Sequence, residues 1–228
     1  MISTWHVTGA DRATGEELLV AFDQGRPMRV LICPAWFDEA NKLRRFTIEV
    51  MRQLDRAGID SFLPDLPGCN DSLAPLEPQT LSGWKAGMTG ASQFFGATHV
   101  LAIRAGALLA PTHLPGWHYA PQSGPKLLRG MIRARTIAAR EAGREEKAEA
   151  LLAVGRTEGL ILGGWPLGPA MIRELADAEP CLAEGQSEIA QSQLGGPGLW
   201  LRAEPDEDPR QSAALAAIIA ATVSGSAS

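Results

Sequence analysis

Residues 99–111 read HVLAIRAGALLAP, in which a mostly apolar run is followed by a tight turn and a short apolar stretch that Pro111 ends. The run at residues 99–103 predicts a buried strand, and Arg104-Ala105-Gly106 predicts a turn that leads into a helix. A strand that passes through a tight turn directly into a helix is typical of a mostly parallel sheet with crossover helices.

The residues on either side continue this alternation of short apolar runs and helical patterns. Strands are predicted at residues 4–8, 17–22, 29–33, 60–65, 157–162 and 198–202, and helices at residues 43–57, 79–95, 170–178 and 209–223. The segment at residues 122–156, rich in arginine and glutamate, predicts an inserted helical lid. We therefore expect a single α/β domain over residues 1–228, with a doubly wound, mostly parallel sheet.

The composition argues against several classes of protein. Hydrophobic residues make up 45% of the 228 residues and charged residues 21%, which is typical of a compact globular protein. The net charge of -5 argues against nucleic acid and anionic membranes as partners. The longest apolar stretch, residues 213–223, is shorter than the roughly 20 residues that a membrane span needs. Three widely spaced cysteines, and an N-terminus without signal-peptide character, favour the cytoplasm.

Several stretches of the sequence resemble a known family of enzymes. The loop at residues 65–72, Asp-Leu-Pro-Gly-Cys-Asn-Asp-Ser, is similar to the D-x-x-G-x-G-x-S loop of the α/β-hydrolase fold, and residues 100–109 share that fold's strand-turn-helix order. Residues 34–45, Pro-Ala-Trp-Phe-Asp-Glu-Ala-Asn-Lys-Leu-Arg-Arg, resemble the P-P-F-x-E-E-x-N-K-x-R-R stretch of exosortase A system-associated hydrolases, subfamily 2. Residues 104–110, 121–129 and 167–170 add to that match. The resemblance implies an α/β-hydrolase-like fold and a role in bacterial exopolysaccharide gene clusters.

The residues that would carry hydrolase chemistry are missing from this pattern. The G-x-S-x-G turn of the fold holds a nucleophilic serine, but residues 102–106 are Ala-Ile-Arg-Ala-Gly, so that Arg104 stands at the nucleophile position. A guanidinium stays protonated and cannot accept an acyl group. The triad histidine should come late in the chain, but no histidine follows His118. The sequence predicts an α/β-hydrolase-like protein without a Ser-His-Asp triad, and leaves open whether it is an enzyme.

The cleft residues that remain predict a binding site. Arg104 would stand at a helix N-terminus, where it could bind a carboxylate or phosphate with two parallel hydrogen bonds. Lys42 would supply a second charge. The residues predicted to bind a small anionic or acyl ligand are Trp36, Glu39, Asn41, Lys42 and Arg104. The structural alternative is a salt bridge from Arg104 to Asp65 or Glu39.

Other readings of the sequence stay open. One is an active esterase-like or thioesterase-like hydrolase, or an acyltransferase, with Asp65 or Cys69 as base or nucleophile. Another is an interaction protein that forms a homodimer through a sheet edge or the lid. The aromatic side chains of Trp36, Phe37, Trp117 and Trp165 could line a pocket or belong to the core. His113 and His118 lack a third ligand at a useful spacing, so no metal and no cofactor are predicted.

Overall fold

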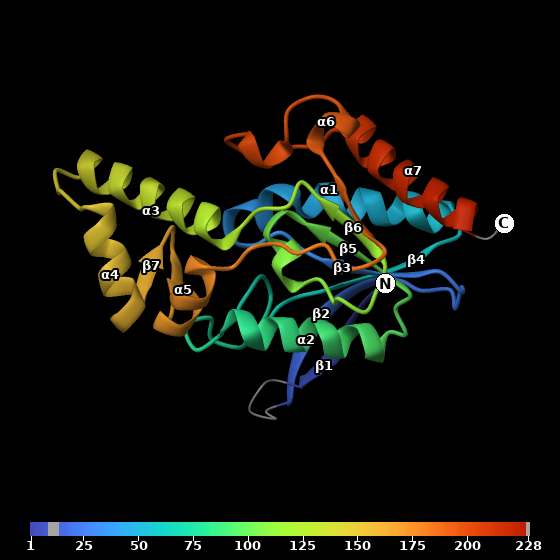
Figure 1. Ribbon diagram of the computed structural model, residues 1–228, viewed down its shortest axis with the longest axis horizontal. Coiled ribbons are helices and arrows are strands. Elements are labelled where there is room, and N and C mark those ends of the chain that lie inside the picture. The colour runs from blue at the N-terminus through green and yellow to red at the C-terminus, as the bar shows by residue number, and fades with distance from the viewer. Residues whose placement is uncertain (9–13, 227–228) are drawn as a thin grey trace.

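The computed structural model describes residues 1–8 and 14–226 (Figure 1). Its described strands form a seven-stranded sheet in the order β1-β2-β4-β3-β5-β6-β9. The strands are β1 Ile2–Thr8, β2 Thr14–Phe22, β3 Arg29–Cys33, β4 Asp60–Pro64, β5 His99–Ile103, β6 Gly116–Tyr119 and β9 Gln186–Ile189. Strand β2 pairs antiparallel with both β1 and β4, and the other neighbours pair in parallel. The predicted mostly parallel sheet is therefore confirmed.

Alternate residues of the central strands belong to two separate cores, one on each face of the sheet. On β3, Leu31 and Cys33 pack into one core, whereas Val30 and Ile32 pack into the other. Such continuous apolar runs are expected of parallel strands that are buried on both faces.

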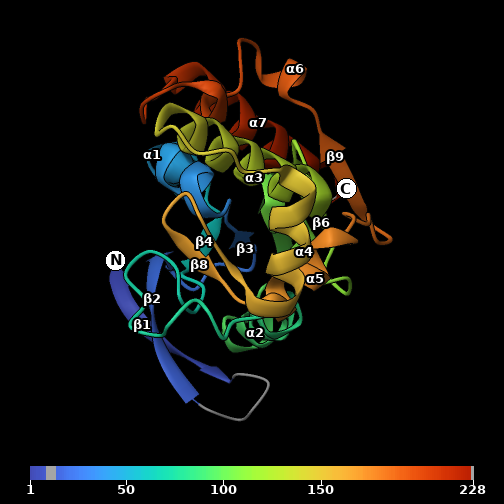
Figure 2. The ribbon, with the colours of Figure 1, turned by 90° about the vertical axis from the view of Figure 1, so that its left-hand side faces the viewer.

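Helices cover both faces, so the sheet is doubly wound as predicted (Figure 2). Helices α1 (Phe37–Arg56) and α7 (Pro209–Ser226) lie together on one face, and α2 (Leu81–Phe94) lies on the other (Figure 1). The short 3-10 helix η1 (Arg104–Leu109) follows β5 without a connecting loop. Because α1 and α2 lie on opposite faces, the chain crosses to one face of the sheet after β3 and to the other face after β4.

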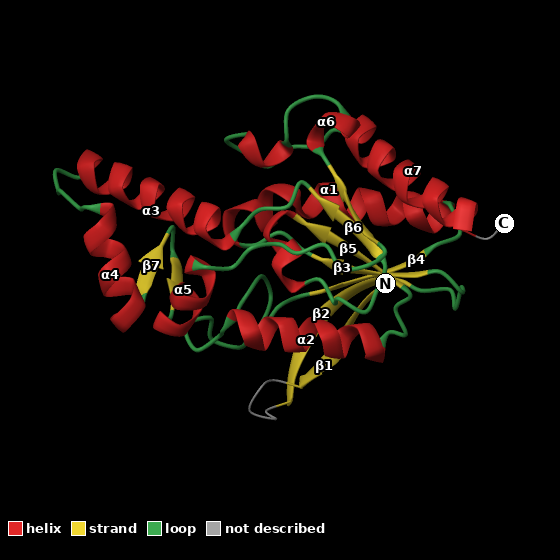
Figure 3. Ribbon diagram, viewed as in Figure 1, coloured by secondary structure: helices red, strands yellow, loops and turns green. Residues whose placement is uncertain are grey.

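A further layer lies between β6 and β9 in the sequence, at the left in Figure 3. It consists of α3 (Gly124–Glu141), α4 (Ala148–Glu158), the hairpin of β7 (Leu160–Leu162) and β8 (Trp165–Leu167), and α5 (Pro169–Ala176). The predicted lid at residues 122–156 covers α3 and most of α4. That these residues act as a lid stays a prediction.

Several predicted boundaries need correction. The strand predicted at residues 198–202 is wrong, because Leu199–Leu201 forms the 3-10 helix η2. The edge strand beside β6 is instead β9, which follows α5 and precedes α6 (Gln191–Leu194). The helix predicted at residues 43–57 begins earlier, at Phe37. The strand predicted at residues 157–162 is shortened to β7, because α4 extends to Glu158. None of the described helices is both long enough and apolar enough to cross a membrane.

Candidate functional site

The strand order creates a crevice at the carboxyl end of the sheet. The chain leaves β3 through α1 to reach β4 on one side, and later returns through α2 to place β5 on the other side of β3. The chain therefore leaves the neighbouring strands β3 and β5 in opposite directions, at the start of α1 and at the start of η1. Ligands of doubly wound proteins bind in the crevice at such a switch point.

Backbone strain is concentrated at this end of the sheet. Among the described residues, those other than glycine with positive φ are Phe37 (φ 55°), Asn70 (φ 52°), Arg104 (φ 56°) and Ala120 (φ 44°). They follow β3, β4, β5 and β6 respectively. Each such residue costs on the order of 1–3 kcal/mol, and such strain is found preferentially at functional sites.

Arg104 is the most strongly held of these residues. It comes directly after β5, and its side chain and backbone together are only 6% exposed. Its Nε and Nη2 donate to the two carboxylate oxygens of Glu39, at 2.9 and 3.1 Å. Its Nη1 donates to the carbonyl oxygen of Ala120 at 2.7 Å, and its Cζ lies 4.0 Å from the ring centroid of Trp200. The guanidinium is thus fixed by a bidentate ion pair, a backbone acceptor and an aromatic face.

A cavity of about 410 Å³ adjoins this arrangement. Glu39 and Trp200, two of the groups that hold the guanidinium, form part of its wall. The remaining lining residues come from the start of α1, from α3 and its approach, and from the β7–β8 hairpin: Trp36, Phe37, Asp38, Gln122, Leu127, Gly130, Met131, Ala134, Leu162, Gly163 and Trp165. The cavity is therefore mostly aromatic and aliphatic, as small-molecule sites usually are.

Two buried polar atoms of the cavity wall have no hydrogen-bond partner among the described residues. They are the indole Nε1 of Trp36, a residue only 1% exposed, and the side-chain Oε1 of Gln122, a residue 8% exposed. Buried polar atoms are almost always paired, because leaving one unpaired costs about 1–3 kcal/mol. Both atoms are buried rather than exposed to the cavity, so a ligand could pair with them only after these side chains move.

The other predicted binding residues are distributed around the crevice. Lys42 forms an ion pair with Asp38, one helical turn earlier, at 2.7 Å. Asn41 lines a second cavity of about 650 Å³, which shares Phe37, Asp38, Gly163 and Trp165 with the first. The structure therefore brings Glu39 to Arg104, and gives Lys42 a different partner.

The two weak catalytic candidates lie outside the lining of the 410 Å³ cavity. Asp65 is 1% exposed and its Oδ1 accepts hydrogen bonds from Arg44 and Asn70, each at 2.9 Å. Cys69 is buried, and this burial, together with the carboxylates of Asp65 and Glu17, raises the pKa of its thiol to about 12. A thiol with so high a pKa is protonated at neutral pH and is a poor nucleophile.

The histidines are dispersed. His113 is within hydrogen-bond distance of Ser92, and His99 of Thr98. His118, on β6, is fully buried, and burial lowers the pKa of its imidazole. Across residues 1–8 and 14–226, no group of three or more histidine, cysteine or acidic side chains is arranged to hold a metal ion.

Similar solved structures include esterases and an epoxide hydrolase. An esterase from Thermogutta terrifontis is 14% identical over 78% of this chain and 68% of its own, with a TM-score of 0.43. An esterase from Pyrococcus furiosus is 15% identical over 60% of this chain and 54% of its own, with a TM-score of 0.41. An epoxide hydrolase from Vigna radiata is 16% identical over 52% and 40%, also with a TM-score of 0.41. The chain thus spans about half the length of the last two. No protein-family profile matches the sequence, and no curated protein matches it.

The topology itself decides the fold. Its sheet is mostly parallel, its helices cover both faces, and Arg104 has a left-handed backbone at a turn from strand to helix, where that fold carries its strained elbow. The fold is α/β-hydrolase-like.

Several residues of the site were not singled out from the sequence, among them Trp200 and Gln122. Trp200 lies in the 3-10 helix η2, 96 positions after Arg104, and the tertiary fold rather than a local pattern brings the two together. Gln122 lies within the matching stretch at residues 121–129, but its residue type alone indicates no role in a site.

Proposed function

We propose that the protein is an α/β-hydrolase-like binding protein without serine-hydrolase activity, and that its cavity takes a neutral acyl compound. The observation that supports this proposal most directly is the position of Arg104. A residue with the φ of a nucleophile elbow follows β5, but its side chain is a buried guanidinium held by Glu39, Ala120 and Trp200. Such a group can neither attack a carbonyl nor turn toward a substrate without breaking this arrangement.

The charges of the site favour a neutral ligand over an anion. Glu39 already neutralises Arg104 through both of its carboxylate oxygens, so little positive charge is left to attract a carboxylate or phosphate. The cavity wall also contains Asp38, whose partner Lys42 is not among the lining residues. An anion would therefore meet acidic groups rather than free cations.

The shape and chemistry of the wall favour an acyl chain that carries an ester or amide. Apolar side chains such as Leu127, Met131 and Trp165 would contact the chain. The Trp36 indole N–H and the Gln122 Oε1 are buried and unpaired in the wall. A change of side-chain rotamer would let the first donate to a ligand carbonyl oxygen and the second accept from a ligand N–H or O–H.

The rest of the assignment is supported by the sequence alone. A role in a bacterial exopolysaccharide gene cluster is proposed from residues 34–45, and the cytoplasm is proposed from the composition. Turnover through Cys69 or Asp65 has no support from the cavity, because neither residue lines it.

Gly130 gives a specific way to block the cavity. It lines the wall from α3, and a Cβ added there would meet no atom within 4 Å. Gly130→Leu should therefore fill the cavity without displacing its walls. Gly90, within α2, has the same open surroundings and does not line the cavity, so Gly90→Leu is the matched control.

The test is a thermal-unfolding titration with decanamide. At 100 times its Kd, the amide should raise Tm by about 5–10 °C in the wild type and in Gly90→Leu, because a ligand that binds only the native state stabilises it. Gly130→Leu should show no shift, and inorganic phosphate should leave the wild-type Tm unchanged. A decanamide shift that survives Gly130→Leu, or no shift in the wild type, would overturn the proposal.

A further inference from the structure

A second apolar groove lies on the other side of α3. It has a volume of about 400 Å³ and is formed by α3, α4 and the end of α5. Its apolar surface is formed mainly by Leu128, Ile132 and Leu152. Leu128 and Ile132 are buried, and Leu152 is half-buried.

Helix α3 separates this groove from the cavity beside Arg104. The positions that line the cavity are 127, 130, 131 and 134, whereas those that line the groove are 125, 128, 129, 132, 133 and 136. At 3.6 residues per turn these two sets occupy different faces of one helix. No residue is shared between the two linings.

The rim of the groove is cationic. Arg129, Arg133 and Arg156 line it and are exposed, and Glu149 is the acidic residue of the lining. Within residues 1–8 and 14–226, none of these three arginines is in an ion pair. Arg135, on the same helix but outside the groove, does pair with Glu146 at 2.8 Å. The excess positive charge is therefore local to the groove, in a chain whose net charge is -5.

We propose that this groove binds a long-chain carboxylate, with its hydrocarbon tail along Leu128, Ile132 and Leu152 and its carboxylate between the guanidiniums of the rim. Arginine binds a carboxylate through parallel hydrogen bonds, and removal of the tail from water provides the hydrophobic contribution.

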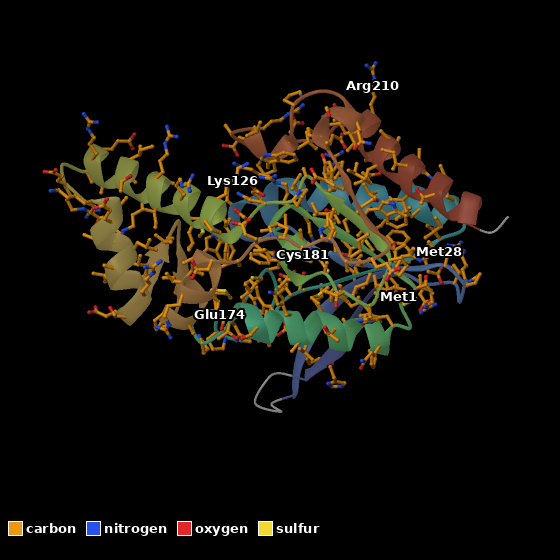
Figure 4. The ribbon with its side chains drawn as sticks, viewed as in Figure 1. Met1, Met28, Lys126, Glu174, Cys181 and Arg210 are labelled. Carbon is orange, nitrogen blue, oxygen red and sulfur yellow. The ribbon has the colours of Figure 1, made fainter. Side chains whose placement is uncertain are left out.

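The test is calorimetric titration of the full chain with dodecanoate below its micellar concentration. The wild type should bind one equivalent. The double variant Arg129→Glu/Arg133→Glu should bind at least ten times more weakly, because it replaces two cations of the rim with anions. Arg210→Glu, whose side chain points outward from α7 in Figure 4, makes one such charge reversal away from the groove and should bind as the wild type does.

Three further titrations identify the groups that are recognised. Acetate, which has the charge without the tail, and dodecyltrimethylammonium, which has the tail with the opposite charge, should each bind at least ten times more weakly than dodecanoate. Gly130→Leu should keep full dodecanoate binding, because Gly130 lines only the other cavity.

Specific results would overturn the inference. Undiminished binding to the double variant while its Tm is that of the wild type, or loss of binding in Gly130→Leu, would place the carboxylate outside the groove. Equal affinity for dodecyltrimethylammonium would show that the charge is not recognised. Equal affinity for acetate would show that the tail is not recognised. Association with anionic phospholipid vesicles without any binding of monomeric dodecanoate would identify a membrane-binding surface instead.

Discussion

At the residue scale, Arg104 combines a strained backbone with a side chain that cannot act as a nucleophile. Arg104 keeps the left-handed backbone of a strand-to-helix elbow at φ 56°. Its charge is matched by Glu39, so the position that could carry a nucleophile instead carries a buried ion pair. Removing one partner of such a pair is costly, because the other charge is left buried and unpaired.

Arg104→Ala should therefore destabilise the protein by about 3–5 kcal/mol, since it leaves the Glu39 carboxylate without its partner. Urea unfolding measures the change. Arg45→Ala is the control, because Arg45 pairs with Glu207 at an exposed position where an ion pair contributes about 1 kcal/mol or less. Equal losses of unfolding free energy in the two variants would show that the Arg104 ion pair stabilises the protein no more than an exposed ion pair does.

Glu17 predicts a dependence of stability on pH. The residue is 3% exposed, its Oε1 accepts from Ser72 Oγ at 2.9 Å, and burial, with the nearby charge of Asp65, raises the pKa of its carboxyl above the ordinary 4.5. The folded protein therefore binds the proton more tightly than the unfolded chain. The stability that this confers is fully present below pH 4.5 and is lost as pH rises through the folded-state pKa.

Glu17→Gln cannot ionise, and its side chain can still accept the Ser72 hydrogen bond. The free energy of unfolding of Glu17→Gln relative to the wild type should therefore rise as pH increases from about 4 to 8. Urea titrations at half-unit pH steps measure this difference. A difference that stays constant across the range would contradict the raised pKa.

At the scale of elements, the central strands β3 and β5 were predicted with correct bounds, whereas β6 and β9 were missed. The bounds predicted for β3 and β5 agree with the structure because their runs are apolar and buried on both faces. Strand β9, Gln-Ser-Glu-Ile, lies at the edge of the sheet and buries only Ile189, so it had no hydrophobic pattern to detect. Strand β6 is only four residues long and begins directly after Pro115, and it was missed for that reason.

The site was predicted only in part, for similar physical reasons. Glu39 was one of two carboxylates considered as a partner for Arg104, and the structure selects it over Asp65, which pairs with Arg44. The pair between Lys42 and Asp38 could have been foreseen, because residues four apart on a helix are neighbours. The approach of Trp200 depends on how the segment that contains the 3-10 helix η2 folds back onto the sheet, which no local pattern encodes.

The close contact between β3 and η1 predicts that Gly106 cannot be replaced. A Cβ at this position would lie 2.3 Å from the carbonyl oxygen of Cys33 and 2.5 Å from that of Pro34. Gly106→Ala should lower the free energy of unfolding by at least about 2 kcal/mol, because backbone rather than flexible side chains would have to move. Thermal or urea unfolding checks this.

Gly90→Ala is the matched control for this substitution. It adds the same methyl group in the open surroundings of α2 and should raise stability by about 0.5–1 kcal/mol, because glycine is a poor helix former. If both substitutions stabilise the protein, the packing of η1 against β3 is not as close as described.

At the scale of the whole molecule, the layer between β6 and β9 gives the fold two separate places for a ligand. Helix α3 faces the cavity beside Arg104 with one set of residues and the arginine-rimmed groove with another. The first lining is mostly aromatic and aliphatic, and its charged members are acidic, whereas the second is aliphatic and cationic. The account therefore assigns neutral acyl compounds to the one and long-chain carboxylates to the other, while the elbow carries no nucleophile.

The most direct test of that last point is an intact-mass spectrum after treatment with a fluorophosphonate, which reacts covalently with activated serines. An active serine hydrolase treated in parallel shows that the reagent works. The account predicts an unchanged mass for this protein, because Arg104 fills the nucleophile position. A stoichiometric adduct on a serine would contradict it.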